Sequence, residues 1–154
     1  MKLFVILNQS NLINAIRFNE DGKSMDDALM IKIMNRRIKL SKIRNEFEED
    51  NQKFIEGIKP DGYAELAQKS QDPSKKLTEE EEKIYKEQTD KLNTSYNTYV
   101  NGKLNDEHDI EDFKLTNDEY NSLIILHKKS VTIQNQEIPS GDFLSMIYEN
   151  FVSE

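Results

Sequence analysis

The chain of 154 residues contains no cysteine and only five glycines. Without cysteine it can form neither a disulfide framework nor a thiolate metal site. The glycines are scattered, so the sequence holds no phosphate-binding loop, no dinucleotide fingerprint and no nucleophile elbow. No pair of carboxylates stands in an apolar setting that would shift its acidity. We therefore expect a protein that is not an enzyme and that needs no metal or cofactor.

Long hydrophobic runs are also absent. The opening segment holds five consecutive apolar residues, Leu3 to Leu7, whereas a secretory core needs ~7–15 and a membrane span about 20. We expect no membrane association and a protein made in a cytoplasm. Apolar residues make up 36% of the chain, against ~45–50% in an ordinary globular domain. This shortfall favours an elongated shape, because a long solvated helix buries only one stripe.

The net charge of −8 is unevenly distributed. Residues 1–44 contain nine Lys or Arg and four Asp or Glu, a balance of +5, so the remaining residues carry −13. A basic start on an acidic body can help neighbouring segments or neighbouring subunits to dock.

Two long helices are predicted to form an antiparallel hairpin. Asp26 is a suitable N-cap, and neither Gly nor Pro follows before Glu56, which predicts a helix of roughly thirty residues, on the order of 45 Å long. A capping box of Thr78 and Glu81 opens the second helix, which ends near residue 101. Residues at seven-residue spacing form the expected hairpin seam: Ile33, Leu40, Phe47, Phe54, Tyr85, Leu92 and Tyr99.

The rest of the chain predicts a small base. The β-forming segment 2–7 predicts a strand, and segments 109–115 and 130–134 predict two more, so we expect a short sheet of about three strands. A second capping box at Thr116–Glu119 opens one short helix, and Pro139-Ser140-Gly141 leads into the last.

These elements indicate a single domain over residues 1–154, α+β but mostly α. The base comprises 1–25 and 103–154, and the hairpin arm comprises 26–102. Arg36 and Asp50 interrupt the heptad stripe, so we expect another subunit to complete the seam.

The two histidines have structural explanations. His108 lies among acidic residues in segment 105–109, but neighbouring residues of an extended segment point to opposite sides and cannot all bind one ion. We interpret the segment as a solvated acidic loop. His127 precedes Lys128 and Lys129 at the end of a helix, where a cationic cluster suits the helix dipole.

One concentrated charge signal remains, in residues 32–44. The run holds six basic residues and no acidic one: Lys32, Arg36, Arg37, Lys39, Lys42 and Arg44. These are the candidate partner-contact residues, for phosphate or for an acidic protein surface. Aromatic residues for base stacking are missing from the run. We favour protein contact or internal neutralisation over nucleic acid, and the candidate neutralising carboxylates are Asp106, Glu107, Asp109, Glu111 and Asp112.

Three segments carry a family resemblance. Asn11-Leu12-Ile13-Asn14-Ala15, the helix end from Arg44 to Ile55, and Phe113-Lys114-Leu115-Thr116-Asn117-Asp118-Glu119-Tyr120 resemble small structural proteins of tailed bacteriophages. The resemblance covers residues 1–57 and 113–152. It implies a virion or assembly component, made in the bacterial host cytoplasm, at a head–tail junction and repeated around a symmetric ring. It transfers no functional residues.

The leading hypothesis is therefore a non-enzymatic bacteriophage structural protein whose partners are other virion proteins and copies of itself. The first alternative is a small inhibitor that binds a host protein, since its carboxylates can stand in for DNA phosphates. The second alternative is a nucleic-acid-binding accessory protein that uses the basic run.

Overall fold

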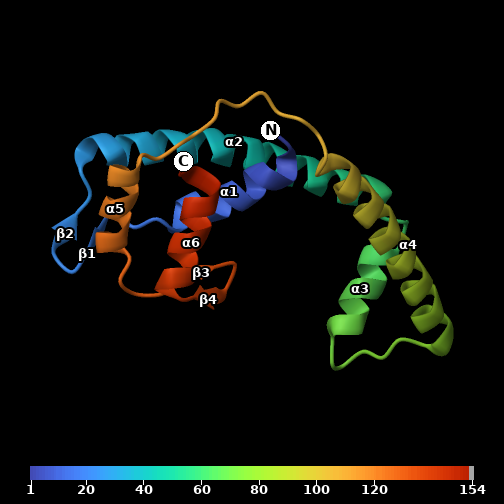
Figure 1. Ribbon diagram of the computed structural model, residues 1–154. Helices are drawn as coiled ribbons and strands as arrows, with labels where there is room; N and C mark the ends of the chain where they lie inside the picture. The colour runs from blue at the N-terminus through green and yellow to red at the C-terminus, as the bar shows by residue number, and fades with distance from the viewer. Residues whose placement is uncertain (153–154) are drawn as a thin grey trace. The chain divides into compact units, whose positions relative to one another are not determined.

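The structure is a computed structural model that describes residues 1–152, and most of these residues are helical (Figure 1). The chain divides into two compact units: residues 1–45 together with the segment from 107 onward, called unit 1, and residues 46–106, called unit 2. The six helices of the described residues are α1 (Leu3–Ala15), α2 (Asp27–Ile58), α3 (Tyr63–Gln71), α4 (Glu79–Lys103), α5 (Asn117–Leu126) and α6 (Ser140–Phe151).

The prediction of a strand at residues 2–7 is wrong, because this segment begins α1. Its buried residues follow a helical rather than an alternating pattern: Leu3, Ile6, Gln9, Ser10, Leu12 and Ile13. Intervals of three and four residues place one face of the helix in the core. Packing along that face overrides the β-propensity of the opening residues.

The two long helices begin where their capping residues predict. The Asp26 carboxylate accepts hydrogen bonds from the backbone N–H groups of Ala28 and Leu29, each at 3.1 Å, and α2 then runs for 32 residues. Thr78 and Glu81 form a complete capping box at the start of α4. Each hydrogen bond satisfies an N–H group that the helix itself leaves unpaired.

The predicted sheet of about three strands is also wrong. The described residues contain two separate two-stranded antiparallel hairpins, β1 (Asn19–Glu20) with β2 (Lys23–Ser24) and β3 (Val131–Ile133) with β4 (Gln136–Ile138). Segment 109–115 is not a strand; its last residue alone forms an isolated bridge, to Val152. With its opening strand replaced by a helix, the expected sheet loses a member, and each hairpin pairs only with itself.

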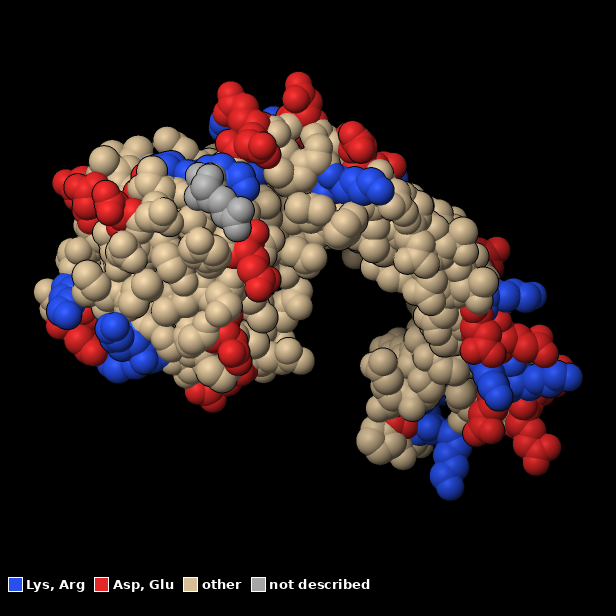
Figure 2. Space-filling model, in the orientation of Figure 1, with Lys and Arg blue, Asp and Glu red and all other residues tan. Residues whose placement is uncertain are grey.

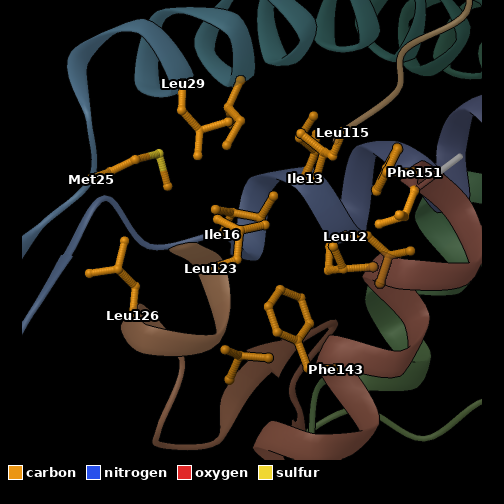
Figure 3. Close-up of a cluster of buried hydrophobic side chains, with 14 of the residues drawn as sticks. Leu12, Ile13, Ile16, Met25, Leu29, Leu115, Leu123, Leu126, Phe143 and Phe151 are labelled. Atoms are coloured by element: carbon orange, nitrogen blue, oxygen red, sulfur yellow. The ribbon is translucent and has the colours of Figure 1, made fainter. Parts of the chain in front are cut away.

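Unit 1 has a continuous hydrophobic core. Figure 1 shows α1, α5 and α6 on one side of the first half of α2, and Figure 3 shows their apolar side chains converging there. The labelled members are Leu12, Ile13, Ile16, Met25, Leu29, Leu115, Leu123, Leu126, Phe143 and Phe151. Ile33 and Leu40 are fully buried members of the same cluster, so these two predicted seam residues are core residues of unit 1.

Unit 2 consists of the second half of α2 with α3 and α4. Phe54 of α2 stacks on Tyr99 of α4, with ring centroids 4.0 Å apart and planes 6° from parallel. Tyr85 of α4 instead stacks on Tyr63 of α3, at 5.5 Å. Phe47 and Leu92, the other expected seam residues here, are half-buried. The segment between the two long helices thus contributes a nine-residue helix, α3, to the packing.

The division into units cuts across the expected base and arm. The prediction assigned all of residues 26–102 to the arm, whereas the first half of α2, up to Asn45, belongs to unit 1. The reason is the burial of Leu29, Ile33 and Leu40, which attach this half of the helix to the core. A seven-residue spacing alone does not tell which partner covers the stripe.

Candidate protein-interaction surface

The basic run of residues 32–44 lies on the half of α2 that belongs to unit 1, and acidic groups elsewhere in the same unit pair with two of its lysines. Lys32 Nζ lies 2.7 Å from Glu119 Oε2, and Lys39 Nζ lies 2.6 Å from Glu111 Oε2. Figure 2 shows acidic side chains along the segment that precedes α5 and runs over α2, with basic side chains beside them. The prediction of internal neutralisation is confirmed for Lys39, whose partner Glu111 was among the expected carboxylates.

The Glu119 carboxylate has two hydrogen-bond partners, Thr116 and Lys32. Its carboxylate accepts a hydrogen bond from the backbone N–H of Thr116, closing the capping box of α5, and it also receives Lys32. Burial alone would raise the pKa of Glu119, but the hydrogen bonds from Lys32 and Thr116 lower it overall. This carboxylate is therefore held charged by its neighbours.

Arg36 is a buried member of the run, with 3% of its surface exposed. Its guanidinium donates to Gln9 Oε1 at 2.8 Å and to the Glu111 carbonyl at 2.7 Å, and lies over the ring of Phe113. Burial lowers the pKa of Arg36, while Asp112 and Glu111 act in the opposite direction. A guanidinium keeps its proton at any ordinary pH, so Arg36 places a fixed charge inside unit 1, with very little surface left for an external phosphate.

Arg37 closes the end of α1. Its Nε donates to the carbonyl of Ile13 at 2.9 Å, and its Nη2 donates to the carbonyls of Asn14 and Ile16. The last carbonyls of a helix have no partner within the helix, and a cation is favoured there by the helix dipole. The guanidinium also lies 4.3 Å from the centroid of the Phe18 ring. Arg37 is thus a structural cap.

Four of the six candidate contact residues therefore have partners within unit 1. Lys42 is exposed and makes no hydrogen bond or ion pair with any described residue, and Arg44 is half-buried. A phosphate-binding surface needs several cations free to face the ligand. The arrangement of the run favours a structural use of its charge.

The opposite side of the same helix carries an apolar stripe that sequence reasoning missed. Ile31, Met34 and Ile38 are 56%, 43% and 66% exposed. Ile31 lies two residues from the buried Leu29, and Ile38 lies two residues from the buried Leu40, so each is turned by about 200° away from the core. Their spacing of three and four residues, visible in the sequence, was the signal that could have revealed them.

Exposed apolar residues are ordinary when scattered, but a contiguous row on one rigid helix is typical of a protein interface. The core side chains on the inner face of α2 hold this row in place, since Leu29, Ile33 and Leu40 are almost fully buried. We call Ile31, Met34 and Ile38 the α2 stripe.

A groove in unit 1 offers a second surface, between α1, the β3–β4 hairpin and α6. Its lining combines amide side chains with the apolar side chains of Leu12, Ile133, Ile138 and Met146; the amides are those of Asn8, Asn11, Gln134, Gln136 and Asn150. Gln134 also has a positive φ of 49°, in the two-residue turn of the hairpin. The lining holds no charged side chain, so it is suited to hydrogen-bonded recognition of a neutral group and not to acid–base chemistry.

His127 is a buried, neutral histidine. Its Nε2 accepts a hydrogen bond from the backbone N–H of Arg17, and its Nδ1–H donates to the carbonyl of Leu123, both at 2.8 Å. This pair of bonds requires the neutral ring, and burial lowers the pKa of His127. The expected cationic cluster at this helix end therefore includes Lys128 and Lys129 only.

His108 has a role through its backbone. Its N–H donates to the Met1 carbonyl at 2.9 Å, and its carbonyl accepts a hydrogen bond from the Met1 amino group at 2.8 Å. Among residues 1–152, no group of three or more His, Asp or Glu side chains is placed to hold a metal ion. No helix in that range is long and apolar enough to cross a membrane.

No protein-family model matches the chain, and no curated protein or solved structure is significantly similar to it.

Proposed function

We propose that this protein is a non-enzymatic assembly component that acts through protein–protein contacts, in a symmetric particle of the tailed-bacteriophage kind. The observation that carries the proposal is the α2 stripe: three large apolar side chains exposed in a row on a helix whose other face is anchored in a core. Exposure of a rigid apolar row to water is unfavourable, and the free energy falls when a partner covers the row.

The contacts that the basic run makes within unit 1 favour a protein-contact role over a nucleic-acid-binding role. Lys32, Arg36 and Arg37 are held by a carboxylate, an amide and backbone carbonyls of unit 1. A nucleic-acid-binding role would need these cations at the surface. The protein-contact role needs only the stripe beside them.

The test is incorporation into particles. The chain, and its variant Ile31→Glu/Ile38→Glu, are expressed from the genome that encodes it, and the protein is quantified by mass spectrometry in purified particles. We expect the unchanged protein in a fixed ratio to the other particle proteins, and a loss of at least tenfold for the variant. The control is Ile125→Glu, which places one glutamate at an exposed isoleucine of α5, outside the stripe.

Circular dichroism of both purified variants shows whether the fold is retained. Absence of the unchanged protein from particles, together with tight binding to a host protein, would replace this proposal with the inhibitor hypothesis. Equal incorporation of the stripe variant would show that another surface makes the contact.

A further inference from the structure

The flanks of the α2 stripe carry opposite charges. Asp27 precedes the stripe and Lys42 follows it, and both side chains are exposed. Neither makes a hydrogen bond or ion pair with any residue from 1 to 152, since the capping role at this helix start belongs to Asp26. The stripe thus has one acidic end and one basic end, each without an internal partner.

These four positions are symmetric about one point of the helix. The point lies halfway between Met34 and Asn35. Ile31 and Ile38 each lie 3.5 residues from it, and Asp27 and Lys42 each lie 7.5 residues from it. With a rise of 1.5 Å per residue, these offsets are about 5 Å and about 11 Å along the axis. Under this symmetry Ile31 corresponds to Ile38, Met34 corresponds to Asn35, and the acidic Asp27 corresponds to the basic Lys42.

We infer that the α2 stripe binds the α2 stripe of a second copy of this chain, with the two helices antiparallel about a two-fold axis that passes between Met34 and Asn35. In such an isologous pair, every residue faces the residue equally far from the axis on the other copy. Ile31 then packs on Ile38 of the second copy, and Asp27 faces Lys42 of the second copy. Each contact occurs twice.

Charge complementarity selects both the partner and the direction. A parallel pair would bring Asp27 against Asp27 and Lys42 against Lys42, which is repulsive, whereas the antiparallel pair joins opposite charges. The small residues Ala28 and Ser41 are also related by the axis, and they allow close approach of the two backbones. Lys32 and Lys39 do not oppose the pairing, because Glu119 and Glu111 already neutralise them.

This inference rests on the proposed function for its surface, since it names the partner of the same stripe. The two fail separately. Incorporation into particles by a protein that stays monomeric would overturn the self-pairing and leave the proposed function standing. A dimer that never enters particles would do the reverse.

Cysteine cross-linking tests the register, and the chain provides a clean background because it has no cysteine of its own. Asn35→Cys places a thiol beside the proposed axis, so the two copies should form a disulfide rapidly under mild oxidation. Asn45→Cys is the matched control: this exposed residue lies 10.5 residues from the axis, so two antiparallel copies would hold their thiols about 30 Å apart. That separation is far beyond disulfide reach.

We expect Asn35→Cys to yield at least ten times more covalent dimer than Asn45→Cys at equal protein concentration. Equal cross-linking of both variants would overturn the antiparallel register, because a parallel pair brings both positions together. Slow cross-linking of both, no faster than that of Ile125→Cys, would overturn the pairing itself.

Charge reversal provides an independent readout by light scattering of the purified full chain. We expect a concentration-dependent mass that approaches two copies of the 18.0 kDa chain, and at least tenfold weaker association for Lys42→Asp. The double variant Asp27→Lys/Lys42→Asp restores opposite charges across the axis and should recover association. A monomeric mass at every concentration, or a double variant weaker than the single one, would overturn the inference.

Discussion

Residues 1–45 and 107–152 contain every fully buried side chain of the described chain, whereas no side chain in residues 46–106 is fully buried. Seventeen buried apolar residues give unit 1 a core of its own. Unit 2 is held by contacts between half-buried groups, of which the Phe54–Tyr99 stack is the closest aromatic pair. Because α2 passes through both units, a single continuous helix packs against a buried core in its first half and makes only half-buried contacts in its second half.

The same local device also appears in both units. In each, a capping-box glutamate receives a lysine from another helix: Glu119 receives Lys32 in unit 1, and Glu81 receives Lys69 in unit 2. The carboxylate of Glu119 is the more sheltered, with 24% of the side chain exposed against 32% for Glu81. Local sequence is thus similar, and what differs is the surrounding core.

The largest expected effect comes from a cavity in the core of unit 1. Phe143 is fully buried beside His127, with ring centroids 5.2 Å apart. Phe143→Ala should lower the free energy of unfolding of unit 1 by about 3–5 kcal/mol, because lost burial and the residual cavity add. Urea denaturation, followed segment by segment with hydrogen exchange and mass spectrometry, measures it. Loss of protection confined to residues 46–106 would contradict the assignment of the core to unit 1.

A pH effect should distinguish the units next. His127 is neutral in the fold with a lowered pKa, and the unfolded ring has a pKa of about 6.5. Between these two pKa values the unfolded chain binds the extra proton, so stability is fully present above pH ~6.5 and falls as the pH drops below it, by at most ~1.4 kcal/mol per pH unit. Unit 2 contains no histidine and should not respond in this range.

Thermal denaturation between pH 7.5 and 5.5 measures this effect. His127→Leu should flatten the dependence, although it lowers stability overall by removing two hydrogen bonds. Carboxylates titrate lower, near pH 4.5 and below, so their contribution is separate. If the pH dependence of thermal stability is unchanged in His127→Leu, its assignment to His127 is wrong.

A smaller effect is expected from the aromatic stack of unit 2. Phe54→Leu keeps an apolar side chain but removes the face-to-face contact with Tyr99, which is worth roughly 0.5–1.5 kcal/mol. Amide exchange should accelerate in residues 46–106 and stay unchanged in unit 1. Equal acceleration in both units would show that they unfold as one, and the comparison would then fail.

The smallest effect concerns the paired glutamates. Glu119→Gln keeps the capping box but removes the charge that faces Lys32, and should cost less than about 1 kcal/mol, since such pairs contribute little when partly exposed. Glu81→Gln is the matched change in unit 2 and should be smaller still. Chemical denaturation at low and high salt measures both. A larger loss of stability for Glu81→Gln than for Glu119→Gln would contradict the expectation that the less exposed glutamate contributes more.

Features encoded within a few residues could be predicted from the sequence. Both capping boxes are present as predicted, because Thr and Glu three residues apart contact each other within one turn. The turn at Asp21-Gly22 is likewise encoded locally, since both residues adopt the positive φ that such turns need. The two long helices follow from their caps and from the lack of breakers between them.

Features that depend on contacts between distant residues could not be predicted from the sequence. Lys32 and Glu119 are 87 residues apart, and no local pattern joins them. Ile33 and Phe54 share one heptad stripe, yet one is buried in unit 1 and the other stacks in unit 2. The α2 stripe was readable in its spacing, but only the burial of the opposite face shows which side remains uncovered.

Unit 1 is discontinuous, and this has a consequence for synthesis on the ribosome. The backbone N–H of Arg17, two residues after the end of α1, donates a hydrogen bond to His127 Nε2, 110 positions away in the sequence. A chain made from its N-terminus at about 5–20 residues per second exposes the apolar face of α1 for several seconds before α5 and α6 exist to cover it. Unit 2, made in between, is complete earlier and has little buried surface to offer. The nascent protein therefore passes through an interval in which the apolar face of α1 lacks the side chains of α5 and α6 that cover it in the completed fold.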